Sequence, residues 1–197
     1  MSLTFSRPDV LQFDEASHAH MLNDVRLPSV TAVLDLLDPF VETSAGIEAG
    51  LRGTITHDAC EYFDLDCLHE GAVPEDCIGR VRAYQRFREQ CGFQIEAIEF
   101  KFYHSKHLYA GRIDRVVNMR GLTILDIKSG AERPTHKLQI AAYAEGYRDF
   151  TGDKPKRAAC VYLRDDGSYT LKWLDEPNAL YDFLAALRCH NWRERHL

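Results

Sequence analysis

The sequence predicts an α/β fold in which a mixed central sheet is flanked by helices. Helix-like segments fill the first half of the chain. Three strand-like segments then follow in succession, near residues 94–104, 108–118 and 122–129. A helix-like segment over residues 135–150 crosses back before two further strands, near residues 158–164 and 168–173. This order of helices, three adjacent strands, a helix and two more strands gives a mixed sheet covered by helices.

The helices of the first half are recognised by their caps and potential breaks. Ser29 is the expected N-cap of a helix that continues to about residue 37. Residues 43–68 are helix-like, with a potential break at Gly50 or Gly53. Residues 75–91 form the next predicted helix. These elements supply the helical cover that the sheet requires.

Turn signals separate the predicted strands. Residues 118–121 form a turn in which Gly121 can take the left-handed conformation of a three-residue hairpin loop. Residues 165–167, Asp-Asp-Gly, predict a second hairpin turn. Asn178 is expected to cap the last helix. The apolar stripe of that helix consists of Leu180, Leu184 and Leu187.

Two aspartates and a lysine lie on neighbouring predicted strands. If Asn118 pairs with Leu122, Asp114 stands directly opposite Asp126, with Cβ atoms about 5 Å apart. Lys128 is two residues beyond Asp126, so the pleat places it on the same face. Two carboxylates at this separation repel each other by about 3 kcal/mol at an effective dielectric constant of about 20. The arrangement is therefore costly unless another group compensates the charge.

A divalent cation between the carboxylates would provide that compensation. Ligand sets made only of oxygen suit Mg²⁺ or Mn²⁺ better than Zn²⁺. A protonated lysine is not a ligand, but it can hold a phosphate oxygen or position a water near the metal. The alternative is a solvated hairpin face with scattered charges, which describes most short motifs of this kind.

The segments Gly111-Arg112-Ile113-Asp114 and Asp126-Ile127-Lys128 together resemble the core motif of the PD-(D/E)XK nucleases. The likeness is to the branch of RecB-like and phage-type exonucleases. Residues 53–57, ending in His57, resemble the upstream histidine motif of that branch, and residues 139–143 resemble its Gln-x-x-x-Tyr motif. The resemblance spans roughly residues 18–150 and implies a restriction-endonuclease-like α/β/α core.

The resemblance implies a metal site and a catalytic lysine. Asp114 and Asp126 would ligate the metal, together with the backbone carbonyl of Ile127 and the side chain of His57. Lys128 would lie beside the attacking water and the scissile phosphate. Two further catalytic residues would contact the phosphate or steady the lysine, namely Gln139 and Tyr143.

Several of these residues also have simpler explanations. His57 and Glu61 share one helical face, and such a pair is usually a surface contact. Glu61 or Glu99 would contribute to a second metal ion, but Glu99 fits a solvated strand face nearly as well. Tyr143 also fits a core aromatic role. The remaining histidines of the loops are expected to be exposed, namely His18, His20, His104 and His107.

The cysteines argue against an iron–sulfur centre. Iron–sulfur members of the resembled family carry three clustered cysteines near the C-terminus, whereas only Cys160 and Cys189 follow the hairpin here. No iron–sulfur cluster is therefore expected. The six cysteines lack metal-ligand spacing and are typical of reduced thiols in the cytoplasm.

Length and composition predict one nuclease-like domain over residues 1–197. Apolar residues make up 45% of the chain, enough for a single core. There is no apolar run of membrane-spanning length, so a cytoplasmic protein without a membrane partner is expected. The net charge of −6 argues mildly against nucleic-acid binding. Basic side chains in the stretch 79–90 are candidates for local docking, although they also suit a solvated helix: Arg80, Arg82, Arg86 and Arg88.

These observations predict a Mg²⁺- or Mn²⁺-dependent deoxyribonuclease, specifically an exonuclease that acts on the ends of linear DNA. Recombination, repair or phage-type DNA processing would be its setting, with a recombination or single-strand-annealing protein as a partner. The choice of exonuclease over endonuclease rests on the family resemblance alone. Two alternatives stay open: a non-catalytic nucleic-acid-binding or assembly subunit with the same fold, and a metal-dependent hydrolase of small phosphate esters.

Overall fold

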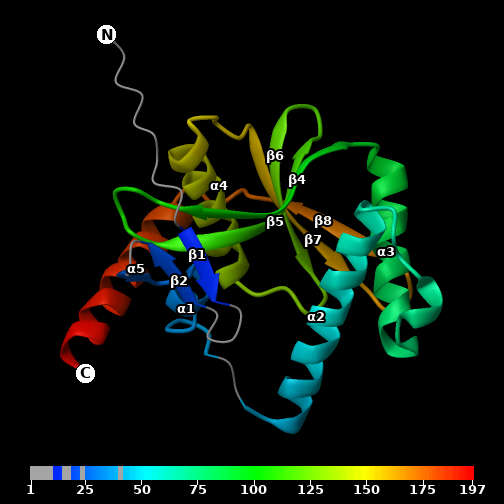
Figure 1. The fold of residues 1–197 in the computed structure, drawn as a ribbon, viewed down its shortest axis with the longest axis horizontal. Helices are drawn as coiled ribbons and strands as arrows, with labels where there is room; N and C mark the ends of the chain where they lie inside the picture. Colours follow the sequence, from blue (N-terminus) through cyan, green and yellow to red (C-terminus); the bar gives the residue numbers. More distant parts are fainter. Residues whose placement is uncertain (1–10, 15–18, 23–24, 40–41) are drawn as a thin grey trace.

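The structure is a computed structural model that describes residues 11–14, 19–22, 25–39 and 42–197. Figure 1 shows its elements in chain order. They are β1 (Leu11–Asp14), β2 (Ala19–Leu22), β3 (Val25–Leu27), α1 (Val30–Leu34), α2 (Ser44–Asp64), the 3-10 turn η1 (Glu70–Ala72), α3 (Glu75–Cys91), β4 (Gln94–Tyr103), β5 (Ala110–Asn118), β6 (Leu122–Lys128), α4 (Thr135–Thr151), β7 (Arg157–Leu163), β8 (Tyr169–Trp173) and α5 (Ala179–His196).

The central sheet has the strand order β4-β5-β6-β7-β8. Strands β6 and β7 pair in parallel, and the other neighbours pair antiparallel. The parallel pair exists because α4 carries the chain back along the sheet between β6 and β7. The predicted mixed sheet is confirmed.

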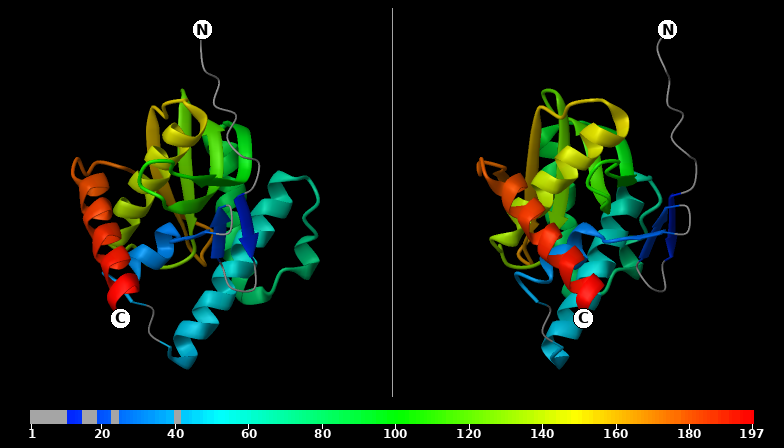
Figure 2. Two further views of the ribbon diagram at one scale, coloured as in Figure 1. Left: turned by 60° about the vertical axis from the view of Figure 1, so that its left-hand side comes forward. Right: turned by 90° about the vertical axis from the view of Figure 1, so that its left-hand side faces the viewer.

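Helices cover both faces of this sheet (Figures 1 and 2). Helix α4 packs on β4 to β7, with α1 and α5 packed against it. Helices α2 and α3 pack on each other, and α3 packs on β7 and β8 from the other side. Each side has its own apolar core, one containing Phe102 and Ile124 and the other containing Phe87 and Leu125. The predicted α/β/α core is therefore confirmed.

Two glycines allow α4 to lie close to the sheet. A Cβ atom at Gly146 of α4 would overlap the Phe102 ring of β4. A Cβ atom at Gly111 of β5 would lie 2.8 Å from that ring and 3.0 Å from the Tyr143 ring. Larger residues at either position would force α4 away from β5. The glycine of the Gly111-Arg112-Ile113-Asp114 motif thus sets how closely the α4 side chains approach β5.

The N-terminal region differs most from the prediction. A small antiparallel sheet, β1-β2-β3, was not predicted from the sequence. Ser29 does cap α1, because its side chain accepts a hydrogen bond from the Ala32 amide, but α1 ends at Leu34. Helix α2 runs unbroken through both glycines. Nothing lies within 4 Å of a Cβ atom built at Gly50, so that glycine costs helix propensity without relieving any clash.

Three predictions about single side chains need correction. His20 and His104 are buried, whereas exposed loop positions were expected. His20 lies in β2 of the small sheet rather than in a loop, and His104 packs against Glu145 and Asp149 of α4. His18 lies outside the described residues. Asn178 precedes α5, but its side chain makes no capping hydrogen bond. The buried face of α5 consists of Ala179, Phe183, Ala186, Leu187 and His190.

Candidate active site

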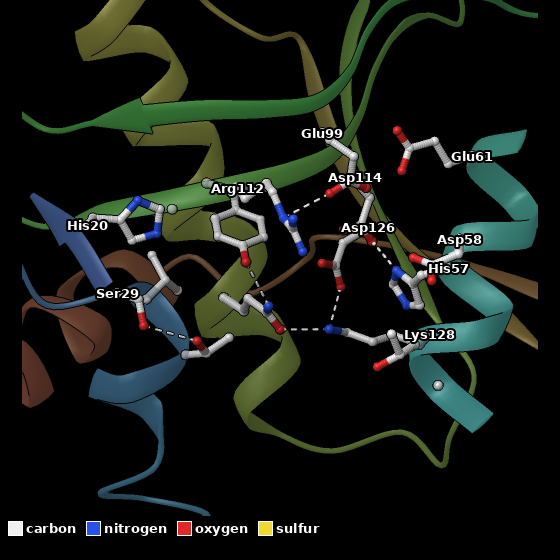
Figure 3. A pocket seen from close by; sticks show the side chains of 17 residues that line it. His20, Ser29, His57, Asp58, Glu61, Glu99, Arg112, Asp114, Asp126 and Lys128 are labelled. Atoms are coloured by element: carbon white, nitrogen blue, oxygen red, sulfur yellow. Dashed lines mark hydrogen bonds and ion pairs between the residues drawn. The ribbon is translucent and has the colours of Figure 1, made fainter. Parts of the chain in front are cut away.

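The hairpin register brings the two motif aspartates together. Asn118 pairs with Leu122, as predicted, and the ladder continues to Arg115 opposite Leu125. The backbone ladder ends there. Beyond it, the side chain of Asp114 contacts β6, because its Oδ2 accepts a hydrogen bond from the Ile127 amide at 2.6 Å. Asp114 and Asp126 both line one cavity of about 360 Å³ (Figure 3).

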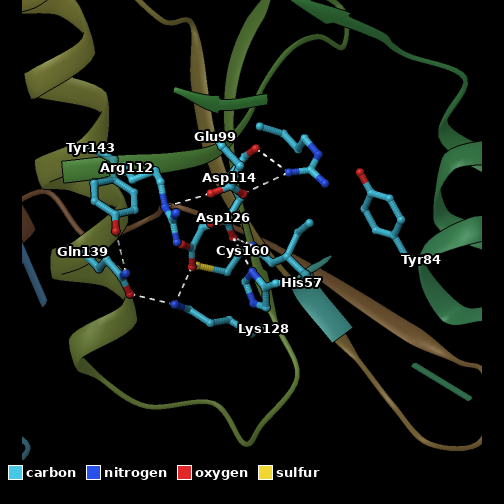
Figure 4. A network of polar contacts seen from close by, with 12 residues as sticks. His57, Tyr84, Glu99, Arg112, Asp114, Asp126, Lys128, Gln139, Tyr143 and Cys160 are labelled. Carbon is cyan, nitrogen blue, oxygen red and sulfur yellow. Dashed lines mark hydrogen bonds and ion pairs between the residues drawn. The ribbon is translucent and has the colours of Figure 1, made fainter. Parts of the chain in front are cut away.

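A chain of hydrogen bonds connects Asp126 to α4 (Figure 4). Lys128 Nζ lies 2.7 Å from Asp126 Oδ2 and donates to Gln139 Oε1, also at 2.7 Å. Gln139 Nε2 then donates to the Tyr143 hydroxyl at 3.0 Å. Gln139 and Tyr143 are four residues apart on one face of α4, so both reach the sheet. Lys128 is thereby held in place by two elements.

The protonation states of these groups follow from burial and charge. Burial raises the pKa of Asp126, and the nearby Lys128 opposes that shift. Burial lowers the pKa of Lys128, but the Asp126 and Asp114 carboxylates outweigh it, so the net shift is upward and the ammonium stays protonated. Burial holds the pKa of Tyr143 well above its usual value, so the hydroxyl keeps its proton. The ammonium also offsets part of the predicted repulsion between the aspartates.

Helix α2 supplies the histidine. His57 Nδ1 lies 3.6 Å from Asp114 Oδ2, and Glu61 lines the same cavity one helical turn later (Figure 3). The helix can approach β6 because Gly53 faces the Ser129 hydroxyl, which lies 3.3 Å from a Cβ atom built at that glycine. His57 and Glu61 therefore share the face of α2 that is turned toward Asp114 and Asp126.

Glu99 of β4 faces the cavity with an unusual backbone. Its φ of 49° is rare for a side chain larger than glycine and marks local strain. Its carboxylate pairs with Arg112 Nε at 2.8 Å and with Arg115 Nη1 at 3.3 Å. Burial, followed by the charge of Asp114, raises the pKa of Glu99 to about 7. Part of this upward shift in pKa comes from the neighbouring negative charge of Asp114, which Arg112 and Arg115 oppose.

The donor set fits a divalent cation. Among the described residues, no group of three or more His, Cys, Asp and Glu side chains is already arranged to hold a metal ion. The cavity nevertheless gathers carboxylates from α2, β4, β5 and β6 and the imidazoles of His20 and His57. Burial is the largest cause of the raised pKa of Glu99, and the negative charge of Asp114 adds to it. A cation would offset that negative charge, and carboxylate oxygens are the ligands that Mg²⁺ and Mn²⁺ prefer.

All the side chains predicted to form the site line this cavity: His57, Glu61, Glu99, Asp114, Asp126, Lys128, Gln139 and Tyr143. The Ile127 amide binds Asp114, while the proposed ligand role of its carbonyl stays a prediction. Arg112 also lines the cavity, and its position two residues before Asp114 could have indicated this. His20, Ser29 and Thr31 line it too, and only tertiary packing brings them there.

Comparison with models of known protein families identifies the family of the chain. The model of the PD-(D/E)XK nuclease superfamily matches residues 73–190. Because the match covers more than half of the 197 residues, the chain belongs to the PD-(D/E)XK nuclease superfamily. His57 and Glu61 lie outside the matched segment. No curated protein matches the chain.

Two solved structures of an alkaline exonuclease are similar in outline. LHK-Exo in complex with dAMP is 12% identical, with 86% of this chain and 88% of that chain covered and a TM-score of 0.47. The alkaline exonuclease LHK-Exo from Laribacter hongkongensis is 15% identical, with 86% and 92% covered and a TM-score of 0.42. These similarities are too low to transfer an activity.

Proposed function

We propose that the protein is a metal-dependent deoxyribonuclease that hydrolyses DNA phosphodiester bonds, and that residues 1–197 form one nuclease domain. The observation that carries the proposal is the placement of Lys128, whose ammonium lies between Asp126 and Gln139 at the wall of an acidic cavity. A binding module has no need to hold a charged lysine beside two aspartates in a partly closed cavity. Cleavage of a phosphate ester needs such a positive charge, because negative charge develops on the phosphate during the reaction.

The carboxylates of the cavity would hold the metal. Asp114 and Asp126 are the proposed ligands of Mg²⁺ or Mn²⁺, with His57 and the Ile127 carbonyl as further ligands. A second ion would involve Glu61 or Glu99. When bound, such an ion lowers the pKa of a coordinated water and neutralises charge that develops on the phosphate.

Lys128 supplies a positive charge that belongs to the protein. An ammonium has three N–H donors, and Asp126 and Gln139 engage two of them. The third can donate to a phosphate oxygen or to the attacking water. Tyr143 fixes Gln139, which in turn orients Lys128. Because Tyr143 keeps its proton, its role in this proposal is to position Gln139 rather than to accept a proton.

Action on DNA ends is the finer part of the proposal. It is supported by the combination of His57, Gln139 and Tyr143, which resembles the exonuclease branch more than sequence-specific restriction enzymes. A cytoplasmic location and a recombination or single-strand-annealing partner belong to the same proposal. Among the described residues, the helices are too short or too polar to cross a bilayer.

The competing function is a non-catalytic DNA-binding or assembly subunit. Loss of a motif residue would favour it, yet Asp114, Asp126 and Lys128 are all present and gathered at one cavity. A hydrolase of small phosphate esters would use the same ligands in a closed pocket. DNA and a chromogenic phosphate monoester, assayed side by side, distinguish these three functions.

The exonuclease proposal is tested with two DNA forms. Purified protein is incubated in Mn²⁺ with end-labelled linear duplex and with closed circular plasmid, and Lys128→Ala protein prepared in parallel controls for contaminating nuclease. Digestion of the linear DNA with the circle largely spared supports an exonuclease. Rapid linearisation of the plasmid would reassign the protein as an endonuclease. Binding without cleavage in any divalent metal would favour the non-catalytic subunit.

A further inference from the structure

A second set of charges lies on the far side of β5 from the cavity. Arg115 follows Asp114 in the strand, so its side chain points to the opposite face. The arginine is only 1% exposed, and the Asp64 side chain at the end of α2 is fully buried. A charged pair this deeply buried requires a physical explanation, because desolvation of both ions is costly.

Arg115 contacts the active site from behind. Its Nη1 donates to the backbone carbonyl of Asp114 at 2.6 Å and lies 3.3 Å from Glu99 Oε1. Its Nε donates to Asp64 Oδ2 at 2.6 Å. The guanidinium therefore contacts Asp114, which is a proposed metal ligand, as well as the cavity residue Glu99 and the buried Asp64. The planar fork of arginine makes these contacts together, which a lysine ammonium does not reproduce.

Asp64 is itself fixed by the α2–α3 layer. The Tyr84 hydroxyl donates to Asp64 Oδ2 at 2.6 Å, and Arg88 Nε lies 2.9 Å from Asp64 Oδ1. Figure 4 shows Tyr84 on the side away from the Lys128–Gln139 chain. Asp64 thus links α3 to β5 through Arg115. The layer that carries His57 and the strand that carries Asp114 are tied together by this buried pair.

We propose that Arg115, anchored by Asp64, is a positioning residue that sets the backbone of Asp114 and the side chain of Glu99 for metal binding and cleavage. The inference rests on the proposed nuclease function. Stability alone does not explain the pair, because well-packed apolar residues of similar volume often stabilise a core equally well. What apolar residues lack is the directed hydrogen bond to Asp114 and the ion pair with Glu99.

The test compares Arg115→Lys with Tyr84→Phe. Arg115→Lys keeps the charge and loses the fork, whereas Tyr84→Phe removes one hydrogen bond of the same buried network without contacting Asp114 or Glu99. Cleavage of linear DNA is measured in saturating Mn²⁺, at a temperature where thermal melts show both variants folded. Arg115→Lys is expected to lower kcat by about tenfold or more with little change in KM, because small misplacements of catalytic groups carry such costs.

Calorimetric titration with Mn²⁺ gives a readout that does not depend on turnover. Arg115→Lys should weaken Mn²⁺ binding, and Tyr84→Phe should leave it and kcat close to wild type. Equal effects of the two variants on both readouts would overturn the positioning role. If Arg115→Lys shows no cooperative melt, Asp64→Asn replaces it, and kcat and Mn²⁺ affinity matching Tyr84→Phe would overturn the proposal. A wild-type protein that binds Mn²⁺ but cleaves no DNA would instead refute the nuclease function.

Discussion

Two adjacent residues of β5 serve two different environments. Asp114 faces a cavity of about 360 Å³ lined by side chains from α1, α2 and α4, among others. Arg115 faces closed space, where its carboxylate partner Asp64 has no exposed surface. On the open side, burial, followed by the negative charge of Asp114, raises the pKa of Glu99 to about 7. On the closed side, Asp64 is paired with both Arg115 and Arg88.

The carboxylates on the cavity side of β5, such as Asp114, need a ligand to balance their charge. On the buried side, the charge of Asp64 is balanced by arginines of the protein itself. The alternation of a strand places the two sides one residue apart. Substitutions on the open face should therefore change cleavage and metal binding more than folding. Substitutions on the closed face that leave the contacts to Asp114 and Glu99 intact should mainly change folding.

Lys128→Ala should lower DNA cleavage by about 10²–10³-fold, because it removes a positive charge placed where negative charge develops. Affinity for Mn²⁺ should stay nearly unchanged, because a protonated lysine does not coordinate the ion. Single-turnover cleavage and calorimetry measure the two effects. Lys137→Ala, which removes a lysine of α4 paired with exposed Asp175, is the matched control. Near-normal cleavage by Lys128→Ala would remove Lys128 from the mechanism.

Asp126→Asn should nearly erase the stabilisation of the protein by Mn²⁺. A bound ion stabilises the native state by about 2.7 kcal/mol at a hundredfold excess over Kd, and the variant loses one proposed ligand. Thermal melts with chelator and with Mn²⁺, at matched ionic strength, measure the gain. Asp153→Asn, at an exposed position outside the cavity, serves as control and should gain as much as wild type. Equal gains in Asp126→Asn and wild type would show that Asp126 is not a ligand.

His136→Gln should make folding less sensitive to acid. Burial, followed by the charges of Lys128 and Arg133, lowers the pKa of His136 to about 4. The unfolded chain binds this proton near pH 6.5, so its contribution to stability is complete above that pH and is lost as pH falls toward 4. The variant should lose about 1 kcal/mol less than wild type over this range. Urea unfolding at pH 7 and pH 4.5 measures it, and parallel losses would contradict the assignment.

The hairpin register was predictable because its determinants are local. The turn at residues 118–121 and the pairing of Asn118 with Leu122 follow from short-range chemistry. The same register places Lys128 on the face of Asp126, where it contacts Gln139. The family motifs pointed to His57 of α2 and to Gln139 and Tyr143 of α4, and all three line the same cavity.

The closed face was not predictable in this way. Asp64 and Arg115 are 51 positions apart, and neither has a pattern that indicates burial. His20 likewise reaches the cavity only through the small sheet that β2 forms with β1 and β3. From the sequence alone, a charged residue with no local partner is predicted to be exposed. A carboxylate that is distant in the sequence can nevertheless offset the desolvation cost of burying it. Tertiary packing, rather than sequence pattern, decides such positions.

The central claim is that this cavity cleaves DNA with a divalent metal, and cleavage of end-labelled linear DNA with and without Mg²⁺ or Mn²⁺ tests it most directly. Wild-type protein should release label in either metal and none in chelator, and added metal should restore the activity of chelated protein. Lys128→Ala protein should release label about 10²–10³-fold more slowly than wild type in either metal. Release of label by wild type in chelator, or none in any divalent metal, would contradict the claim.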